Sequence, residues 1–179
     1  KKPRVSTGFE DIDSVLGGGL FRFEFVVLGG GTGSGKSSFA LQIAHGFGKQ
    51  GPCYVFTGEM SKVENVRRAA AQDLRVKADD LTAGQAYEFE TRSQQVFYDD
   101  ESGMKLDRLA ITLQRFKLAH PNMSAAIIDY IGLLAGRDRF ADINAAITGL
   151  KNLARSLEVP IIGIHMINDE VYRRDNKVP

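Results

Sequence analysis

The sequence predicts an α/β fold with a mostly parallel central sheet flanked by helices. Five short apolar runs alternate along the chain with segments of helical periodicity, and most of these runs are apolar throughout. Continuous apolar runs are typical of central parallel strands that are covered on both faces. Strands and helices in alternation form βαβ units, which build parallel sheets. The predicted strands are Phe23–Leu28, Cys53–Thr57, Gln95–Tyr98, Ala125–Tyr130 and Pro160–His165.

Apolar residues at helical spacing predict the helices between these strands. In Ser38–Lys49 the residues Phe39, Ile43 and Phe47 recur at helical intervals, and a second helix is expected over Ser61–Gln72. Two later apolar stripes predict two more helices. They consist of Leu106, Leu109, Leu113 and Phe116, and of Ile143, Ala146, Ile147, Leu150, Leu153, Ala154 and Leu157.

Size and composition predict one globular domain over residues 1–179, with 43% hydrophobic and 25% charged residues. The single cysteine, Cys53, excludes an intramolecular disulfide, and its apolar surroundings predict a buried thiol. No apolar stretch is long enough to span a membrane, and the first residues lack a signal-peptide core. We therefore expect a cytoplasmic protein without a membrane partner. A net charge of +1 provides no global attraction for nucleic acid, so any such binding depends on local basic clusters.

The run Gly30–Ser37 (GGTGSGKS) fits the pattern G-x-x-x-x-G-K-[ST] and lies between a predicted strand and a predicted helix. Small residues let backbone N–H groups curl around the phosphates of a nucleotide, and a helix N-terminus favours the same negative charge. Lys36 would reach the β- and γ-phosphate oxygens, and the Ser37 hydroxyl would bind Mg²⁺. We expect ATP and Mg²⁺ to bind at Gly31, Thr32, Gly33, Ser34, Gly35, Lys36, Ser37 and Ser38.

Polar residues close several of the predicted strands. The glycine-rich loop follows the first strand, Glu59 follows the second, Asp129 ends the fourth, and His165 ends the fifth. The carboxyl ends of parallel strands meet at one edge of a sheet, where ligands bind. We therefore expect these residues to converge, with the strand before Glu59 beside the strand before the glycine-rich loop.

Each of these three side chains has a functional and a structural interpretation. Asp129 would hold Mg²⁺ through its water shell beside Ser37, or it would cap the turn that follows. Glu59 would orient or deprotonate the water that attacks the γ-phosphate, or it would cap the Ser61–Gln72 helix. His165 would sense the γ-phosphate, or it would be a neutral histidine that bonds a backbone carbonyl. Glu59 and Lys36 are the candidate catalytic residues.

The motifs resemble one family closely, the C-terminal ATPase domain of DnaB-type replicative DNA helicases, which has a RecA-like P-loop fold. The discriminating pair is Gly58–Ser61 (GEMS) together with Ile127–Leu134 (IIDYIGLL). The opening Ser6–Asp13 (STGFEDID) with Gly17–Leu20 (GGGL) also occurs in RadA- and KaiC-type ATPases. The segment Leu153–Ile162 (LARSLEVPII) follows the helicase pattern too, so the similarity covers nearly the whole chain.

The chain departs from this family pattern at several positions. Met166 stands where the family usually has Gln, so the γ-phosphate sensor is missing or has moved to His165. Asp169 stands where Arg is usual, and the stretches Ala83–Gln95 and Ala135–Ala141 are short. The sequence stops before the segment that carries the arginine finger in this family. The resemblance therefore implies a catalytic core fragment without that segment and without the N-terminal domain.

The resemblance implies ATP-driven 5′→3′ translocation along single-stranded DNA by a homo-oligomer, a hexameric ring with ATP sites between subunits. The loops Leu134–Asp142 and Met166–Lys177 would face DNA in the channel and contact its phosphates without reading bases. Primase and a helicase loader are implied partners through regions outside this sequence. The candidate DNA contacts, which would otherwise form a solvated charged surface, are Arg137, Arg139, Arg173, Arg174 and Lys177.

Two other functions remain open. A RecA- or RadA-type recombinase or a KaiC-like ATPase would share the fold but would need a polymerisation motif or a duplicated core. A loader or assembly protein that binds ATP and hydrolyses it poorly would suit Met166. ATP hydrolysis measured with and without single-stranded DNA separates these functions from that of a helicase motor.

Overall fold

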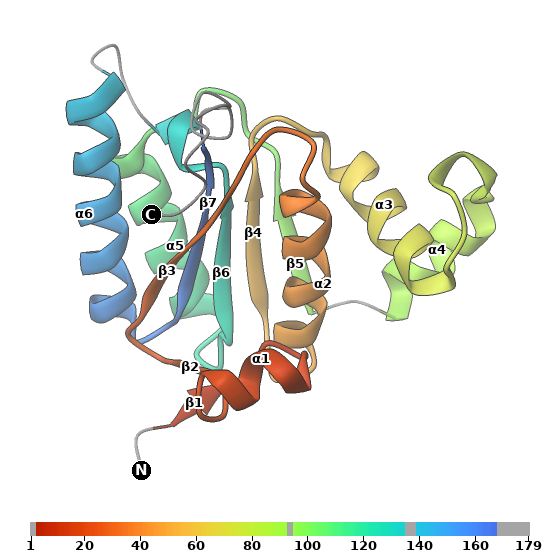
Figure 1. Cartoon of the computed structure of the whole chain (residues 1–179), viewed down its shortest axis with the longest axis horizontal. Coiled ribbons are helices and arrows are strands. Elements are labelled where there is room, and N and C mark those ends of the chain that lie inside the picture. Colours follow the sequence, from red (N-terminus) through yellow and green to blue (C-terminus); the bar gives the residue numbers. More distant parts are fainter. Residues whose placement is uncertain (1–2, 93–94, 135–138, 168–179) are drawn as a thin grey trace, which may run out of the picture.

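A five-stranded parallel sheet forms the centre of the computed structural model, which describes residues 3–92, 95–134 and 139–167 (Figure 1). The four strand pairings are all parallel. The predicted α/β fold with a parallel central sheet is therefore confirmed. Across the sheet the order is β3 (Phe25–Gly30), β7 (Ile161–Met166), β6 (Ala125–Asp129), β4 (Cys53–Thr57) and β5 (Val96–Asp99).

Helices cover both faces of this sheet. Helix α2 (Lys36–Gly48) packs on one face, while α5 (Leu106–Ala119) and α6 (Arg139–Leu157) pack on the other. Successive side chains of a strand point to opposite faces, so Ile127 belongs to the core under α2 and Ile128 to the core under α5 and α6. Both side chains are fully buried, and Cys53 is buried as expected. This two-sided burial explains why the strands are apolar throughout.

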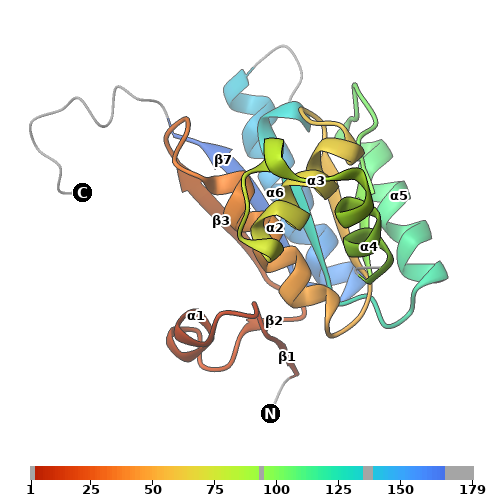
Figure 2. The same cartoon turned by 90° about the vertical axis from the view of Figure 1, so that its right-hand side faces the viewer.

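The remaining elements lie around the sheet. Beyond β4 the chain forms α3 (Lys62–Leu74), a 3₁₀ turn η1 (Ala78–Asp80) and α4 (Ala83–Arg92), and α3 and α4 pack together around a small apolar cluster (Figure 2). A second 3₁₀ turn, η2 (Ile131–Leu134), follows β6. In the part of the chain that the structure describes, no helix has the length and apolarity to cross a membrane.

An N-terminal segment lies at the amino ends of the central strands (Figure 1). It comprises β1 (Arg4–Val5), α1 (Glu10–Val15) and β2 (Leu20–Phe21), and β1 pairs with β2 in antiparallel orientation. The side chain of Gln50 joins it to the end of α2, because its amide donates to the carbonyls of Ser6 and Gly46. The opposite edge of the sheet, where the strands end, is left for the candidate site.

The expected position of β4 is wrong. β4 does not lie beside β3, because β7 and β6 lie between them. Apolar runs reflect burial on both faces and carry no information on which strands are neighbours, so the order could not be read from them. As a consequence, Glu59 follows a strand that pairs with the strand of Asp129, and Thr57 is opposite Asp129 in that pairing.

The first central strand is also displaced from its predicted bounds of Phe23–Leu28. The chain turns after β2, where the Glu24 N–H donates to the Phe21 carbonyl at 3.1 Å, so the strand begins only at Phe25. It continues through Gly29 and Gly30, because these residues pair with His165 and Met166 of β7. The first glycine of the glycine-rich motif is therefore the last residue of the strand.

Candidate nucleotide-binding and catalytic site

The glycine-rich loop connects the end of β3 to the start of α2. Gly33 and Gly35 have φ angles of 74° and 85°, a left-handed conformation that residues with side chains rarely adopt. Gly35 is the N-cap of α2, and no side chain caps the helix there. The N–H groups in the first turn of a helix have no intrahelical partner and favour negative charge. Because residues 32–35 are exposed, a phosphate can reach this turn.

Lys36 is the first residue of α2, and its side chain lies over the loop. Its ammonium donates a hydrogen bond to the Gly31 carbonyl, with 2.6 Å between Nζ and O. The Ser34 N–H donates to the same carbonyl at 3.3 Å, which closes the turn. The loop therefore combines open backbone donors with one cation, and this combination suits a polyphosphate.

Ser37 and Asp129 come together although they belong to different elements. Asp129 ends β6, and its carboxylate lies close to the Ser37 side chain of α2. Burial raises the pKa of Asp129, while the Ser37 hydroxyl and the charges of Lys36 and Arg68 act in the opposite direction. A hydroxyl and a carboxylate side by side supply the oxygen ligands that Mg²⁺ prefers, so these two residues fit the metal.

Glu59 lies in the short loop between β4 and α3. Its side chain is exposed, and its carboxylate forms no hydrogen bond or ion pair with the described residues. The Gly58 N–H donates to the Asp129 carbonyl at 3.2 Å, so the Glu59 loop starts beside Asp129. The N-cap of α3 is Ser61, whose side chain accepts from the Glu64 N–H. The capping interpretation of Glu59 is therefore wrong, and its carboxylate is available for a ligand or water.

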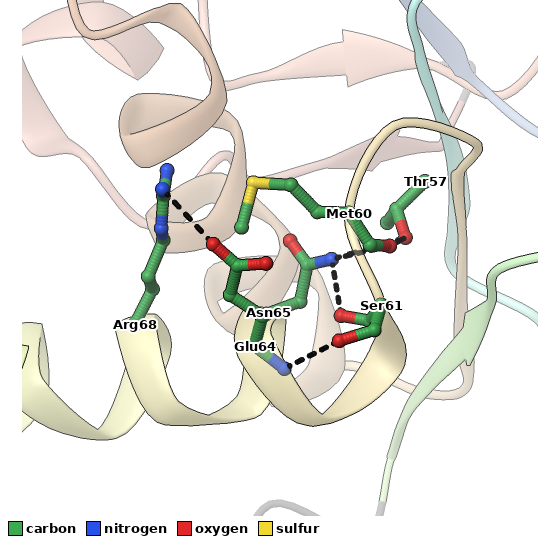
Figure 3. Close-up of polar contacts among 6 residues, drawn as sticks. All are labelled: Thr57, Met60, Ser61, Glu64, Asn65 and Arg68. Carbon is green, nitrogen blue, oxygen red and sulfur yellow. Dashed lines mark hydrogen bonds and ion pairs between the residues drawn. The ribbon is translucent and has the colours of Figure 1, made fainter.

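Asn65 is a site residue that the sequence analysis missed. It lies in the first turns of α3 and is only 2% exposed. Figure 3 shows its side-chain amide pointing back at the Glu59 loop, where Nδ2 donates to Thr57 Oγ1 and to the backbone carbonyls of Met60 and Ser61. The sequence signal for it was a polar residue four positions after the helix N-cap, on a helix that otherwise buries alanine and valine.

Arg68 is a second missed residue, one helical turn further along α3. It pairs with Glu64 at 3.3 Å (Figure 3), and its charge partly opposes the rise that burial causes in the pKa of Asp129. Arg68 therefore contributes positive potential to the same edge as Lys36. The available signal was the four-residue spacing between Glu64 and Arg68, which places both on one helix face.

His165 lies near the end of β7, opposite Gly29 of β3. Its Nδ1 atom is buried and has no hydrogen-bond partner within the described part of the chain. Nδ1 of His165 therefore does not bond a backbone carbonyl of the described residues, as the structural interpretation required. Met166, the next residue, is opposite Gly30 and 39% exposed, so an apolar side chain borders the start of the glycine-rich loop.

The candidate DNA contacts fall largely outside the described residues. Arg137, Arg173, Arg174 and Lys177 lie outside them, and Arg139 is described only as the first residue of α6. The structure therefore tests none of these basic residues. It does bring the glycine-rich loop, Asp129, Glu59 and His165 to the same edge of the sheet, as their positions at the ends of parallel strands predicted.

A comparison with protein families matches residues 4–179 to the DnaB-like helicase C-terminal domain. Among individual proteins, the chain is 27% identical over 190 residues to the replicative DNA helicase DnaB of Helicobacter pylori, covering 98% of this chain and 39% of that protein. It is 28% identical over 192 residues to DnaB of Synechocystis, covering 99% of this chain and 22% of that protein. The chain thus spans well under half of the length of these relatives.

Solved structures show the same fold. One solved ATPase domain superposes with a TM-score of 0.84 at 24% identity, covering 100% of this chain and 69% of that one. A DnaB-like replicative helicase, described together with its interactions with primase, gives the same TM-score of 0.84 at 23% identity, covering 100% of this chain and 47% of that one.

Proposed function

Because the chain belongs to the family of DnaB-like helicase C-terminal domains, we propose that it is the ATP-hydrolysing motor domain of a replicative DNA helicase. The observation that carries the proposal is the proximity of the Ser37 side chain to the Asp129 carboxylate. It joins the glycine-rich loop to an acidic strand end, directly beside the loop that carries Glu59. A phosphate-binding turn, a pair of oxygen ligands and an available carboxylate are the parts that ATP hydrolysis requires.

In this mechanism the loop and Lys36 bind the triphosphate of ATP. The backbone N–H groups of Gly31–Gly35 surround the β-phosphate, and the Lys36 ammonium exchanges the Gly31 carbonyl for phosphate oxygens. Ser37 and Asp129 would hold Mg²⁺, which when bound neutralises charge on the β- and γ-phosphate oxygens. Asp129 must be ionised in that role, and the positive charges of Lys36 and Arg68 favour its ionised form.

Glu59 acts on the water. It accepts a proton from the attacking water as the water oxygen bonds to the γ-phosphorus. The bond between that phosphorus and the β,γ-bridging oxygen breaks, and ADP leaves with the electron pair. His165 would sense the γ-phosphate from its position near the end of β7, through a part of its ring other than the buried Nδ1. An arginine supplied by a neighbouring subunit would complete the charge stabilisation.

Hydrolysis would drive movement along single-stranded DNA in the 5′→3′ direction. We propose a hexameric ring in the cytoplasm, in which Arg137, Arg139, Arg173, Arg174 and Lys177 contact the DNA backbone. The support is family membership and the position of these residues after β6 and β7, the strands that end at Asp129 and Met166. Primase and a helicase loader are the proposed partners of the whole protein.

A second candidate function is a loader or assembly protein that binds ATP but hydrolyses it slowly. The observation in its favour is Met166, an apolar side chain beside the glycine-rich loop. Steady-state ATP hydrolysis with and without single-stranded oligothymidine separates the two functions. A motor domain shows turnover that rises when the oligonucleotide is added, whereas an ATP-binding loader shows slow turnover that the oligonucleotide leaves unchanged.

A further inference from the structure

We propose that Asn65 is a positioning residue that fixes the Glu59 loop, because it ties the end of β4 to the start of α3. The inference rests on the proposed function, in which Glu59 activates the attacking water. Asn65 does not contact the reacting atoms in this account and acts only through the backbone that carries Glu59.

The position of Asn65 on α3 follows from helix geometry. Side chains of a helix tilt toward its N-terminus, so a residue one turn after the N-cap Ser61 reaches back over the preceding loop. Nδ2 of Asn65 lies 3.0 Å from Thr57 Oγ1, 3.0 Å from the Ser61 carbonyl and 3.3 Å from the Met60 carbonyl (Figure 3). One amide therefore contacts both sides of the loop.

Thr57 extends this connection through its hydroxyl, which accepts from Asn65 and donates to the Met60 carbonyl at 2.8 Å. Thr57 is the last residue of β4 and only 3% exposed, so the hydroxyl is a fixed part of the sheet edge. At the other side of Glu59, the Gly58 N–H is held by the Asp129 carbonyl. Glu59 is thus the one residue of the loop between two anchored neighbours, Gly58 and Met60.

The amide is not needed to satisfy these backbone carbonyls, because the Met60 carbonyl also accepts from Thr57 Oγ1 and the Ser61 carbonyl also accepts from the Asn65 backbone N–H. The helix start is capped separately by Ser61. What the amide adds is the link across the loop. Asparagine is an unfavourable residue for a helix interior, so this link is made at the expense of helix stability.

The exposed side chain of Glu59 makes this link relevant to turnover. Its carboxylate has no partner among the described residues, so its place depends on the backbone of Gly58–Met60. Rate depends steeply on the position of catalytic groups, and a displacement of about 1 Å can reduce it ~10²-fold. Loosening the loop should therefore lower kcat while leaving ATP affinity, which depends on the glycine-rich loop, unchanged.

The test compares the wild type with Asn65→Leu, Glu59→Gln and the double variant, each measured for kcat, for KM and for ATP affinity by calorimetry. Leucine matches asparagine in size and lacks the donors. We expect Asn65→Leu to lower kcat about tenfold, less than the ~10²–10⁴-fold expected when the base itself is removed. ATP affinity should stay within about twofold. In the Glu59→Gln background the Asn65 substitution should have no further effect.

Different outcomes separate this inference from the proposed function. Wild-type turnover by Glu59→Gln would remove the role of Glu59 in activating water, and the inference with it. Absence of ATP turnover in the wild type would remove the proposed function itself. Slow Glu59→Gln with wild-type-like Asn65→Leu would overturn only the positioning role. The same would follow if Asn65→Leu slowed the Glu59→Gln variant by the same factor as the wild type, because Asn65 would then act independently of Glu59.

Controls address folding. Thr57→Val removes the hydroxyl at nearly constant shape and should reproduce the loss of kcat, whereas Thr57→Ser keeps the hydroxyl and should restore it. This pair decides the question if Asn65→Leu does not fold. Ser124 is 1% exposed and bonds the Gly51 and Pro52 carbonyls just before β6, at the opposite edge of the sheet. Ser124→Ala should lower the melting temperature without changing kcat. A matching pattern for Asn65→Leu would show a structural role only and overturn the proposal.

Discussion

The Ser37 side chain of α2 lies close to the carboxylate of Asp129 at the end of β6. This contact links the phosphate-binding turn to the acidic strand end across two elements that are distant in the sequence. It places the two candidate Mg²⁺ ligands together and beside the Glu59 loop, whose Gly58 N–H binds the Asp129 backbone.

Replacement of Lys36 by alanine should weaken ATP binding strongly, because no other described cation lies over the glycine-rich loop as Lys36 does. Hydrogen bonds to charged groups contribute about 1.5–3 kcal/mol, which corresponds to roughly 10–100-fold in affinity. Calorimetric titration with Mg-ATP measures the effect. Lys49→Ala is the matched control at the other end of α2, and its affinity for Mg-ATP should equal that of the wild type. Wild-type affinity of Lys36→Ala for Mg-ATP would exclude the loop as the phosphate site.

Replacement of Asp129 by asparagine should raise the Mg²⁺ concentration required for half-maximal turnover, since an amide is a weaker ligand for this cation than a carboxylate. The fold should survive, because burial already disfavours the charged form of Asp129 and raises its pKa. A Mg²⁺ titration of ATP turnover provides the measurement, with Asp107→Asn on the exposed start of α5 as control. An unchanged Mg²⁺ requirement would remove Asp129 from the metal site.

Neutralisation of the basic loop residues should weaken DNA binding without changing ATP binding. Arg137→Gln with Arg139→Gln, or Arg173→Gln with Arg174→Gln, should each reduce affinity for single-stranded DNA. Each pair should also make binding less sensitive to salt. The slope of the logarithm of the binding constant against the logarithm of the salt concentration should become shallower by about 0.7 for every phosphate that the protein no longer neutralises. Fluorescence anisotropy over a salt series measures both quantities. The control is Lys151→Gln with Arg155→Gln near the other end of α6. Unaltered binding in all four loop replacements would contradict the channel assignment.

His45 should make folding stability depend on pH below neutrality. Burial lowers the pKa of His45 to about 4, and Nε2 lies 3.2 Å from the Tyr98 hydroxyl. The unfolded chain takes up a proton near its ordinary pKa of about 6.5, so stability is full above that pH and falls between about 6.5 and 4. The total loss is up to about 3 kcal/mol.

Urea unfolding of the wild type and of His45→Gln across this pH range tests the prediction. The wild type should lose stability relative to the variant as the pH falls from about 6.5 toward 4, because glutamine does not titrate. Parallel pH profiles for the two proteins would show that another group is responsible.

Local pattern and strand direction were sufficient to predict part of the site. The glycine-rich loop, Ser37 and Asp129 could be predicted because each is fixed by its own segment, and parallel strands bring their ends to one edge. The position of β4 could not, because all the central strands are equally apolar and their order is decided by tertiary packing. The neighbour of the Glu59 loop was therefore missed, and with it the contact between Gly58 and Asp129.

Asn65 and Arg68 illustrate a different limit. Whether they face the site depends on how α3 is rotated against the loop before it, and that rotation is set by the Ser61 cap and the packing of Val66 and Ala70. A single sequence gives the spacing of these residues but not the face that meets the sheet edge. The basic residues after β6 and β7 remain predictions from the family resemblance alone.

The role of Glu59 in ATP hydrolysis is tested by the turnover of Glu59→Gln, compared with its ATP affinity in the same preparation. Glutamine keeps the size and hydrogen bonding of the side chain but cannot accept the proton of the attacking water. ATP affinity should equal that of the wild type, while kcat in the presence of single-stranded DNA should fall by ~10²–10⁴-fold. Hydrolysis at the wild-type rate by Glu59→Gln would contradict the account and assign water activation to another residue.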